Sequence, residues 1–196
     1  SWHLWGLYNA RNAAMAALAA ALAGGYTDPR DFEIAALTRF NGVKRRQEIL
    51  ATSAGLTLMT DFAHHPTAVR ETLVSLRSRF PGQSLHLCFE ARSNTTCRNL
   101  HETAFELAFD EADEVHLGGV FRPERYADSE RIDFAGMAKR LGRKATAHGS
   151  NAALETSLEE RIRAGLAGVL IFFSNGSFDG IPLRLGQVLE DIPDRR

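Results

Sequence analysis

The sequence lacks the two glycine-rich signatures by which nucleotide-binding proteins are most easily detected. Neither GxGxxG nor GxxxxGK[ST] occurs in its 196 residues. The first absence argues against an ordinary dehydrogenase, and the second argues against an ATPase that holds its phosphates unaided. Any anion must therefore be held by a local cation or by a short turn of backbone N–H groups.

An excess of charge of one sign is also missing. The chain has 23 basic and 24 acidic residues, so it lacks the broad basic field of nucleic-acid binders, and no nucleic-acid partner is expected. No apolar run approaches the roughly 20 residues that a membrane span needs, so no membrane partner is expected. Cys88 and Cys97 are the only cysteines, and we interpret Cys88 as a buried strand residue in a reduced, cytoplasmic protein.

Helical and apolar segments alternate from Gly42 onward. Two strands joined by a tight turn are predicted in "KRRQEILAT" and "LTLMTDF", and helices and strands then follow in turn to the end of the chain. This alternation predicts an α/β fold with a mostly parallel sheet that is covered by helices on both faces.

Two helices are expected before this unit. "LYNARNAAMAALAAALAGG" is rich in alanine and ends in a glycine pair, and "TDPRDFEIAALTRF" has Thr27 or Asp28 as a cap and Pro29 in its first turn. The chain opens abruptly on apolar residues, so we expect it to be cut from a longer protein. Residues 1–39 are then the helical end of a preceding domain, and residues 40–196 form the main domain.

Ligands bind at the carboxyl ends of strands in such sheets. Five polar loops directly follow apolar runs and are the candidate site: "DFAHHP", "EARSNTT", "GGVFRPERY", "HGS" and "SNGSFDG".

The loop "DFAHHP" combines several signals. Pro66 suits the first position of a helix, where its missing N–H costs nothing. The adjacent His64 and His65 have no acid or cysteine at a ligand spacing, so no metal site is expected within this fragment. His65 is interpreted as a packing or capping residue at the helix start, and His64 as an ordinary loop residue unless it serves a nucleotide. Asp61 is either a cap or an acceptor for ribose hydroxyls.

Cations and small residues mark three further positions. In "GVKRRQE", Arg45 and Arg46 are expected to alternate across a strand, so that one points inward and clamps a phosphate, unless the run is simply solvated. The turn "SNGSFDG" offers backbone N–H groups to an anion, although packing alone also explains its glycines. In "EARSNTT", Arg92 suits a substrate carboxylate, with an ordinary polar loop as the alternative.

Taken in order, the segments "YNARNAAMAA", "FNGVKRRQE", "TDFAHHPTAVRETL", "EARSNTT", "ADEVHL" and "SNGSFDGI" resemble the muramyl ligase family. The resemblance covers essentially the entire chain. It implies a sugar-nucleotide domain and a central P-loop domain before a C-terminal Rossmann-like domain, which this chain would represent together with the last helices of the central one. Within the family, "EARSNTT" and "SNGSFDGI" resemble the murein peptide ligase branch, which uses a tripeptide as its amine substrate.

The resemblance implies roles for individual residues. Its HNxxN signature falls on Asn9 and Asn12, near the adenine; Arg46 is expected at the ATP phosphates as the catalytic residue, and Asp61 at the ribose, with His64 beside the nucleotide. ATP and Mg²⁺ are the implied cofactors, and the metal ligands are expected mainly outside this chain. The residues expected to contact the tripeptide lie in two loops: Arg92, Ser93, Asn94, Thr95, Ser174, Asn175, Gly176, Ser177 and Asp179.

Several positions depart from the family pattern. Tyr8 replaces a histidine, Thr60 an acid and Ala91 a proline, while Ser177 and Asp179 replace glycines. Asp179 adds an acid that either receives an amine or caps the following helix.

The implied reaction activates the lactyl carboxylate of UDP-N-acetylmuramate as an acyl phosphate, which the amine of L-Ala-γ-D-Glu-meso-diaminopimelate then attacks. This would serve peptidoglycan recycling. Two alternatives stay open: a ligase that adds L-alanine, and a non-catalytic Rossmann-like module that binds a nucleotide or peptide. Without a P-loop, the chain is expected to be inactive alone.

Overall fold

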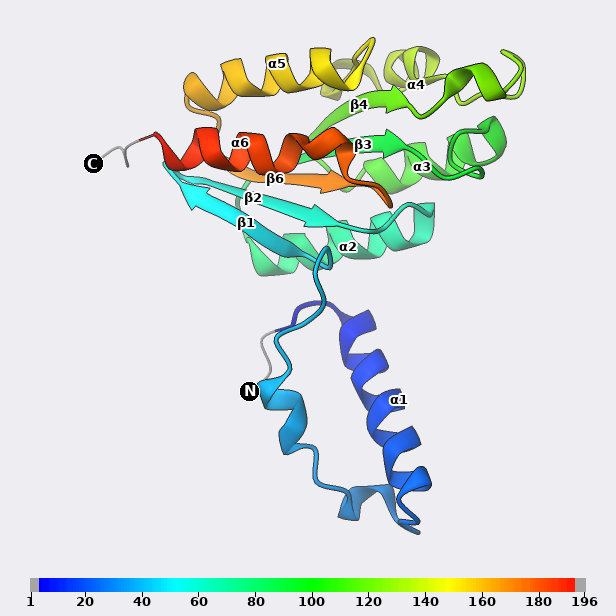
Figure 1. Cartoon of the computed structure of the whole chain (residues 1–196), viewed down its shortest axis with the longest axis vertical. Coiled ribbons are helices and arrows are strands. Elements are labelled where there is room, and N and C mark those ends of the chain that lie inside the picture. Colours follow the sequence, from blue (N-terminus) through cyan, green and yellow to red (C-terminus); the bar gives the residue numbers. More distant parts are fainter. Residues whose placement is uncertain (1–3, 193–196) are drawn as a thin grey trace.

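The structure is a computed structural model and describes residues 4–192. Six strands form one sheet in the order β1-β2-β6-β3-β4-β5 (Figure 1). β1 pairs antiparallel with β2, and every other pairing is parallel. The strands are β1 Glu48–Ser53, β2 Leu56–Asp61, β3 Leu85–Ala91, β4 Glu114–Val120, β5 Ala145–Ala147 and β6 Gly168–Phe173.

Helices cover both faces of this sheet, as the alternating pattern predicted. α2, α3 and α4 pack on one face, and α5 and α6 pack on the other. Neighbouring residues of β6 serve opposite cores, because Ile171 belongs to the first and Phe172 to the second. The helices are α2 Pro66–Arg79, α3 Glu102–Phe109, α4 Phe134–Leu141, α5 Asn151–Arg163 and α6 Ile181–Glu190.

Residues 4–43, here called the arm, extend away from the sheet (Figure 1). The arm contains α1, Leu7–Ala23, which ends before Gly24 and the left-handed Gly25 as expected. The second expected helix is wrong: its segment forms two short 3₁₀ turns, Pro29–Asp31 and Ala35–Arg39, with Asp28 capping the first. Phe32, between the two turns, adopts extended backbone and so interrupts the helix, and phenylalanine and isoleucine both have modest helix propensity.

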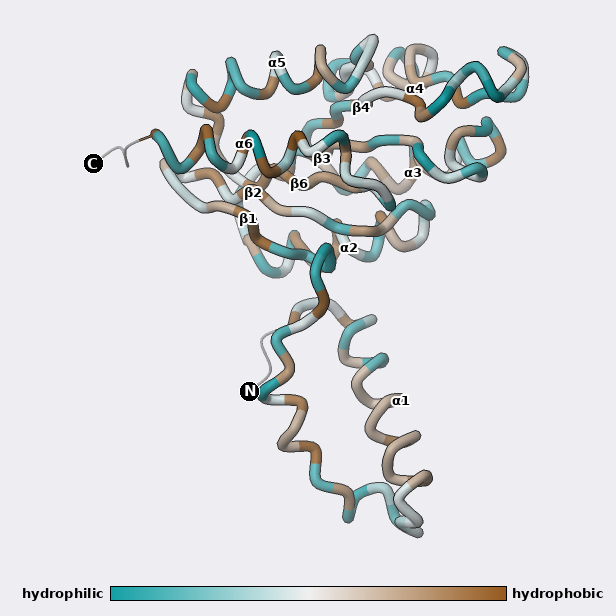
Figure 2. The backbone as a smooth tube through the Cα atoms, in the orientation of Figure 1, coloured by the Kyte–Doolittle hydropathy of each residue, from teal (hydrophilic) through white to brown (hydrophobic). Residues whose placement is uncertain are grey.

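Apolar residues occur both in the sheet with its helices and in the arm. In Figure 2, brown apolar stretches follow the strands between the helical layers, and they also occur along α1. In the part of the chain that the structure describes, no helix is long and apolar enough to cross a membrane.

Candidate functional site

The five polar loops meet along one edge of the sheet, as predicted. β2, β6, β3, β4 and β5 are parallel neighbours, so their carboxyl ends lie side by side (Figure 1). Residues 84 positions apart in the chain are thereby brought into contact: Ser174 Oγ donates to Glu90 Oε2 at 2.6 Å. The candidate site is an edge that several strands build together.

Residues 44–47 form a turn that leads into β1. The expectation that Arg45 and Arg46 alternate across a strand is wrong, because the strand begins only at Glu48. Arg45 and Gln47 adopt left-handed backbone conformations, with φ of 60° and 48°. Both arginine side chains of this turn approach the Phe62 ring, with the Arg46 guanidinium 5.3 Å from its centroid, but Arg45 is half-buried and Arg46 is exposed.

Arg45 points toward the loop after β6. Its Nη2 donates to the carbonyl oxygen of Ser174 at 2.5 Å and also to that of Gly176. Its guanidinium also lies 5.0 Å from the ring centroid of Phe62. Arg45 is therefore a fixed internal support of that loop, while Arg46 is exposed.

Asp61 is buried and holds this turn in place. One carboxylate oxygen accepts the backbone N–H of Gln47 at 2.9 Å, and the other accepts that of Ala63 at 2.8 Å. Burial raises the pKa of Asp61, although these two hydrogen bonds and the nearby Arg46 and Arg45 oppose the shift. Its direct partners are backbone groups, so its effect on a ligand would pass through the turn that carries Arg46.

Two adjoining cavities lie between the arm and this turn, here called the arm cavities. They measure about 420 and 580 Å³, and Asn9 and Arg46 line both. Asn12 lines the larger one together with Tyr8 and Phe40. The structure thus gathers Asn9, Asn12 and Arg46, while Asp61 and His64 do not line these cavities.

Tyr8 joins the arm to the sheet. Its hydroxyl accepts the Nε2 amide of Gln47 at 2.5 Å, and the same amide lies 3.0 Å from Ser75 Oγ on α2. Burial raises the pKa of Tyr8, so its neutral form is favoured. The residue that departs from the family pattern serves here as a link between the two parts.

The adjacent histidines point to separate neighbours. His64 Nδ1 lies 3.0 Å from the carbonyl oxygen of Phe62, and His65 packs edge-on against His101 at 5.4 Å. His65 occupies the cap position of α2 without a side-chain cap bond, and Pro66 is its first helical residue, as predicted. Within residues 4–192, no three His, Cys, Asp or Glu side chains gather as metal ligands would.

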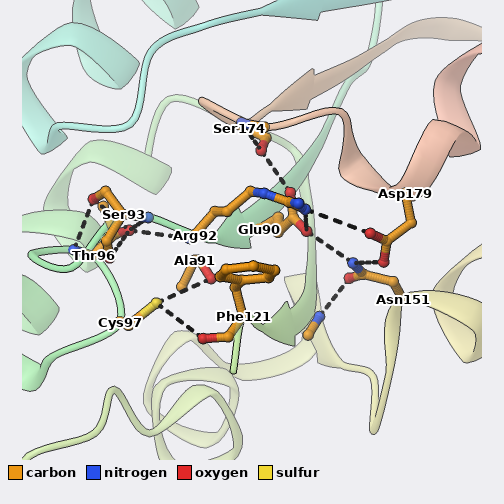
Figure 3. Close-up of polar contacts among 12 residues, drawn as sticks. Glu90, Ala91, Arg92, Ser93, Thr96, Cys97, Phe121, Asn151, Ser174 and Asp179 are labelled. Atoms are coloured by element: carbon orange, nitrogen blue, oxygen red, sulfur yellow. Dashed lines mark hydrogen bonds and ion pairs between the residues drawn. The ribbon is translucent and has the colours of Figure 1, made fainter. Parts of the chain in front are cut away.

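A buried acid, Glu90, organises the centre of the edge (Figure 3). Its side chain is 2% exposed and accepts hydrogen bonds from three groups: Ser174 Oγ at 2.6 Å, Asn151 Nδ2 at 3.0 Å and Arg92 Nη1 at 3.2 Å. Asn151 Nδ2 also donates to Asp179 at 2.7 Å. A carboxylate satisfied by three donors from three elements fixes those elements relative to one another.

Arg92 is held from several sides. Its guanidinium lies 4.3 Å from the ring centroid of Phe121, and Nη1 lies 3.4 Å from Asp179 Oδ1 as well as close to Glu90. Gly176 lies against another side: a Cβ at that position would approach Arg92 Cδ to 1.9 Å, so a larger residue there would displace the Arg92 side chain. Arg92 therefore neutralises two acids of the protein itself.

The other residues predicted to contact the substrate lie in the turn after β3 and in the loop after β6. Ser93 and Thr96 bond each other in a tight turn, with Ser93 Oγ and Thr96 Oγ1 2.9 Å apart, whereas Asn94 and Thr95 are exposed on its outside. In the loop after β6 the structure places a buried Ser174, half-buried Asn175 and Gly176, and exposed Ser177 and Asp179.

A cavity of about 580 Å³ opens beside this cluster, here called the edge cavity. Its lining includes the acids Glu90 and Asp179, and Arg122 and Arg131 from the loop after β4. Its remaining wall is mostly small or apolar: Gly118, Gly119, Val120, Phe121, Pro123, Ile132, Phe134, Ala135, Ala147, His148, Gly149, Ser150 and Asn151.

Three residues of this cluster were not predicted from the sequence. Glu90 is an acid inside a mostly apolar strand, which is itself a signal of a buried, partnered carboxylate. Asn151 directly follows the loop "HGS", and Phe121 lies within "GGVFRPERY", so position at the carboxyl edge was the available signal for both.

A second polar cluster lies beneath α5. Arg161 donates to Glu114 at 2.7 Å and to His116 Nε2 at 2.9 Å, and Glu114 also bonds His86 at 2.6 Å. Because arginine only donates, Nδ1 of His116 carries the ring proton and donates to His148 at 3.2 Å. Burial lowers the pKa of His116 to about 4, so this imidazole is neutral at pH 7.

Comparison with known proteins places this architecture in a family. Residues 45–174 match the family described as Mur ligase, glutamate ligase domain. The match covers more than half of the chain, so the chain belongs to this Mur ligase family.

Similar curated sequences carry the name UDP-N-acetylmuramate–L-alanine ligase. The one from Desulfitobacterium hafniense (strain Y51) is 32% identical over 132 residues, which are 67% of this chain and 28% of the relative. The one from Roseiflexus sp. (strain RS-1) is 35% identical over 106 residues, covering 54% of this chain and 22% of the relative. The chain thus spans less than a third of the length of these relatives.

Solved structures share the fold. A murein peptide ligase from Psychrobacter arcticus 273-4 superposes with a TM-score of 0.68 at 25% identity, over 100% of this chain and 39% of the other. A UDP-N-acetylmuramate–alanine ligase from Thermotoga maritima gives the same TM-score at 23% identity, over 93% and 37% of the two chains. The predicted Rossmann-like fold class is confirmed.

Proposed function

We propose that this chain is the C-terminal part of an ATP-dependent ligase that joins an amine to the carboxylate of UDP-N-acetylmuramate. Residues 40–196 are its C-terminal domain, and residues 1–39 belong to the end of the central domain. The family match supports the first part, and the exposed apolar side chains of the arm, such as Leu7 and Leu22, support the second.

The nucleotide is assigned to the arm cavities. Arg46 presents an exposed cation there beside the amides of Asn9 and Asn12, a donor set that suits phosphates and a base. Asp61 would act through the turn that it fixes, and His64 from the loop after β2. ATP, when bound, supplies the phosphoryl group that activates the carboxylate of UDP-N-acetylmuramate, and the Mg²⁺ ligands are assigned to the rest of the protein.

The amine substrate is assigned to the edge cavity, and we propose the tripeptide L-Ala-γ-D-Glu-meso-diaminopimelate. The observation that carries this choice is the size and charge of the cavity, about 580 Å³ with acids and arginines in its lining. L-Alanine would fill a small part of it, whereas a peptide with several carboxylates and an additional ammonium group would use both kinds of charge. The contribution of this domain is to orient the reactants, which is a large share of catalysis in such reactions.

An acceptor comparison tests the substrate. The full-length protein is assayed for ATP-dependent amide formation with UDP-N-acetylmuramate and either the tripeptide or free L-alanine. A higher kcat/KM for the tripeptide supports the proposal, and a higher value for L-alanine contradicts it. The 196-residue chain, lacking a P-loop, is the negative control and is expected to turn over neither ATP nor acceptor.

The role of Arg46 is tested in the same assay. Arg46→Ala should lower kcat by about 10²-fold or more with a smaller change in KM, because a donor to developing phosphate charge acts chiefly in the transition state. Arg39→Ala is the matched control, since Arg39 is an exposed arginine of the arm that lines neither arm cavity. A near-normal kcat for Arg46→Ala would return Arg46 to a solvated surface cation.

An L-alanine ligase is the second candidate. The names of the curated relatives favour it, because those quoted above are UDP-N-acetylmuramate–L-alanine ligases. In that case the edge cavity would hold one amino acid and a large volume of water.

A further inference from the structure

Residues 148–150, here called the β5–α5 loop, connect β5 to α5 and form part of the wall of the edge cavity. Asn151 fixes the far end of this loop: its Nδ2 donates to Glu90 at 3.0 Å, and its Oδ1 accepts the Gly119 N–H at 2.6 Å. His148 fixes the near end. Of these two residues, only His148 can change its charge near neutral pH.

His148 is bonded to β4 through both its backbone and its ring. Its N–H donates to the carbonyl oxygen of Leu117 at 2.8 Å. Its ring stacks on that of His116, with the centroids 5.5 Å apart and the planes at 28°, and its Nε2 lies 3.2 Å from Nδ1 of His116. The contact between the rings therefore depends on a proton that His116 supplies and that the facing nitrogen of His148 lacks.

The protons of this contact can be arranged in only one way. Arg161, on α5, donates from Nη1 to Nε2 of His116 at 2.9 Å, and a guanidinium cannot accept a hydrogen bond. His116 must therefore donate from Nδ1, and His148 must accept at Nε2 and carry its own proton on Nδ1. A proton added to His148 Nε2 would face the N–H of His116, and His116 cannot reverse its tautomer without turning an N–H toward Arg161. Uptake of a proton by either ring thus breaks a hydrogen bond.

The charged and titratable neighbours of His116 come from its own strand, from β3 and from α5. Glu114, on β4, lies 3.8 Å from His116 Nε2 and is the neighbour that favours a proton there. It already accepts hydrogen bonds from Arg161 at 2.7 Å and from His86 at 2.6 Å, so its charge is largely engaged. Cys88 pairs with His116 across the two strands, and burial raises the pKa of its thiol, which is therefore neutral.

Burial decides the direction in which the two rings titrate. It lowers the pKa of His116 to about 4 and also lowers the pKa of His148. Both folded-state values lie below the value of about 6.5 for an unfolded histidine, so the neutral rings and their hydrogen bond are favoured above pH 6.5. They are lost as the pH falls through the folded-state values.

We propose that Arg161, His116 and His148 form a pH-sensitive switch, which holds the β5–α5 loop on β4 while both rings are neutral and releases it when either ring takes up a proton. The apolar face of α5 stays packed in the core, so the release is confined to residues 148–150. One wall of the edge cavity is then rigid at neutral pH and mobile in acid. The switch goes beyond the proposed function, because it requires no substrate, nucleotide or further domain.

Nitrogen NMR of the histidine rings tests the closed state. In the 196-residue chain near pH 7, His116 and His148 should both be neutral and should both carry their proton on Nδ1. A proton on Nε2 of either ring would overturn the proposed chain of hydrogen bonds. This measurement uses the wild type, so it holds even where a variant fails to fold.

Backbone NMR relaxation tests the release. The order parameter of the Gly149 amide should fall from about 0.85 to below about 0.6 as the pH is lowered from about 7 to about 4, while that of Val169 on β6 stays near 0.85. His148→Phe keeps a ring without titratable nitrogens and should remove this pH dependence. His65→Phe is the matched control, because His65 also packs on a histidine, His101, and it should behave as the wild type. A constant order parameter for Gly149 in the wild type would overturn the switch.

Two variants of Arg161 test why the switch opens. Arg161→Gln introduces an amide that can accept as well as donate, so His116 can reverse its tautomer and accept from a protonated His148. The order parameter of Gly149 should then stay high in acid. Arg161→Lys is the matched control, since an ammonium only donates, and it should preserve the fall seen in the wild type. The same pH dependence in both variants would overturn the role of Arg161 as the fixed donor.

Discussion

The arm and the sheet both contain many apolar residues, but only the sheet buries them. Phe89 on β3 is fully buried among the aromatic rings of α3 and α4, whereas Leu7, Met15 and Leu22 on α1 are 63–65% exposed. Only Ala13 and Ala21 of α1 are buried. The alanine-rich α1 is thus helical with little of its surface buried, whereas a core requires a second layer to pack against the first.

The largest expected effect on this contrast comes from the sheet core. Phe89→Ala should lower the free energy of unfolding of the 196-residue chain by about 3–5 kcal/mol, because it removes ring contacts with Phe105, Phe109 and Phe134 and leaves a cavity. Urea unfolding followed by circular dichroism measures this. Leu22→Ala in the arm is the control and should change the value by less than about 0.5 kcal/mol. A similar loss of unfolding free energy for Phe89→Ala and Leu22→Ala would contradict the distinction between the sheet core and the arm.

A somewhat smaller effect should appear on acidification. The folded-state pKa of His116 is about 4, below the value of about 6.5 for an unfolded histidine, so the unfolded chain binds its proton first as the pH falls. Stability from this group is fully present above pH 6.5 and decreases toward pH 4, by about 3 kcal/mol in total. His116→Gln should flatten this part of the pH profile of the free energy of unfolding. His65→Gln, at a loop, is the control and should leave the slope unchanged.

The smallest effect is expected at the link between arm and sheet. Tyr8→Phe removes the hydroxyl that accepts the Gln47 amide, at a cost of about 1 kcal/mol. Amide hydrogen exchange in α1 should quicken while exchange in β3 stays constant. Tyr26→Phe, a change to an exposed tyrosine at the far end of the arm, is the control. Faster exchange in β3 would mean that the arm supports the sheet.

Sequence periodicity predicted the sheet well because local patterns determine it. The alternation of apolar runs and helical faces located the strands, and Pro66 and Asp28 fulfilled their predicted local roles. The five loops then followed from the parallel topology alone.

The interior of the site was less predictable because its partners are distant in sequence. Glu90 meets Ser174 and Asn151, and no local pattern pairs these positions. The turn before β1 was missed because Arg45 and Gln47 adopt left-handed conformations usually associated with glycine or asparagine.

Adjacent positions in the turn before β1 tie the two proposed sites to one another. Arg45 supports the carbonyl groups of the loop after β6, while Arg46 lines the arm cavities. An engineer who transplants the loop after β6 from a relative with another acceptor would also have to match residue 45, and a change there would shift the neighbouring Arg46. We therefore expect that amine-substrate specificity and nucleotide binding cannot be redesigned independently. The turn before β1 and the loop after β6 should be exchanged together.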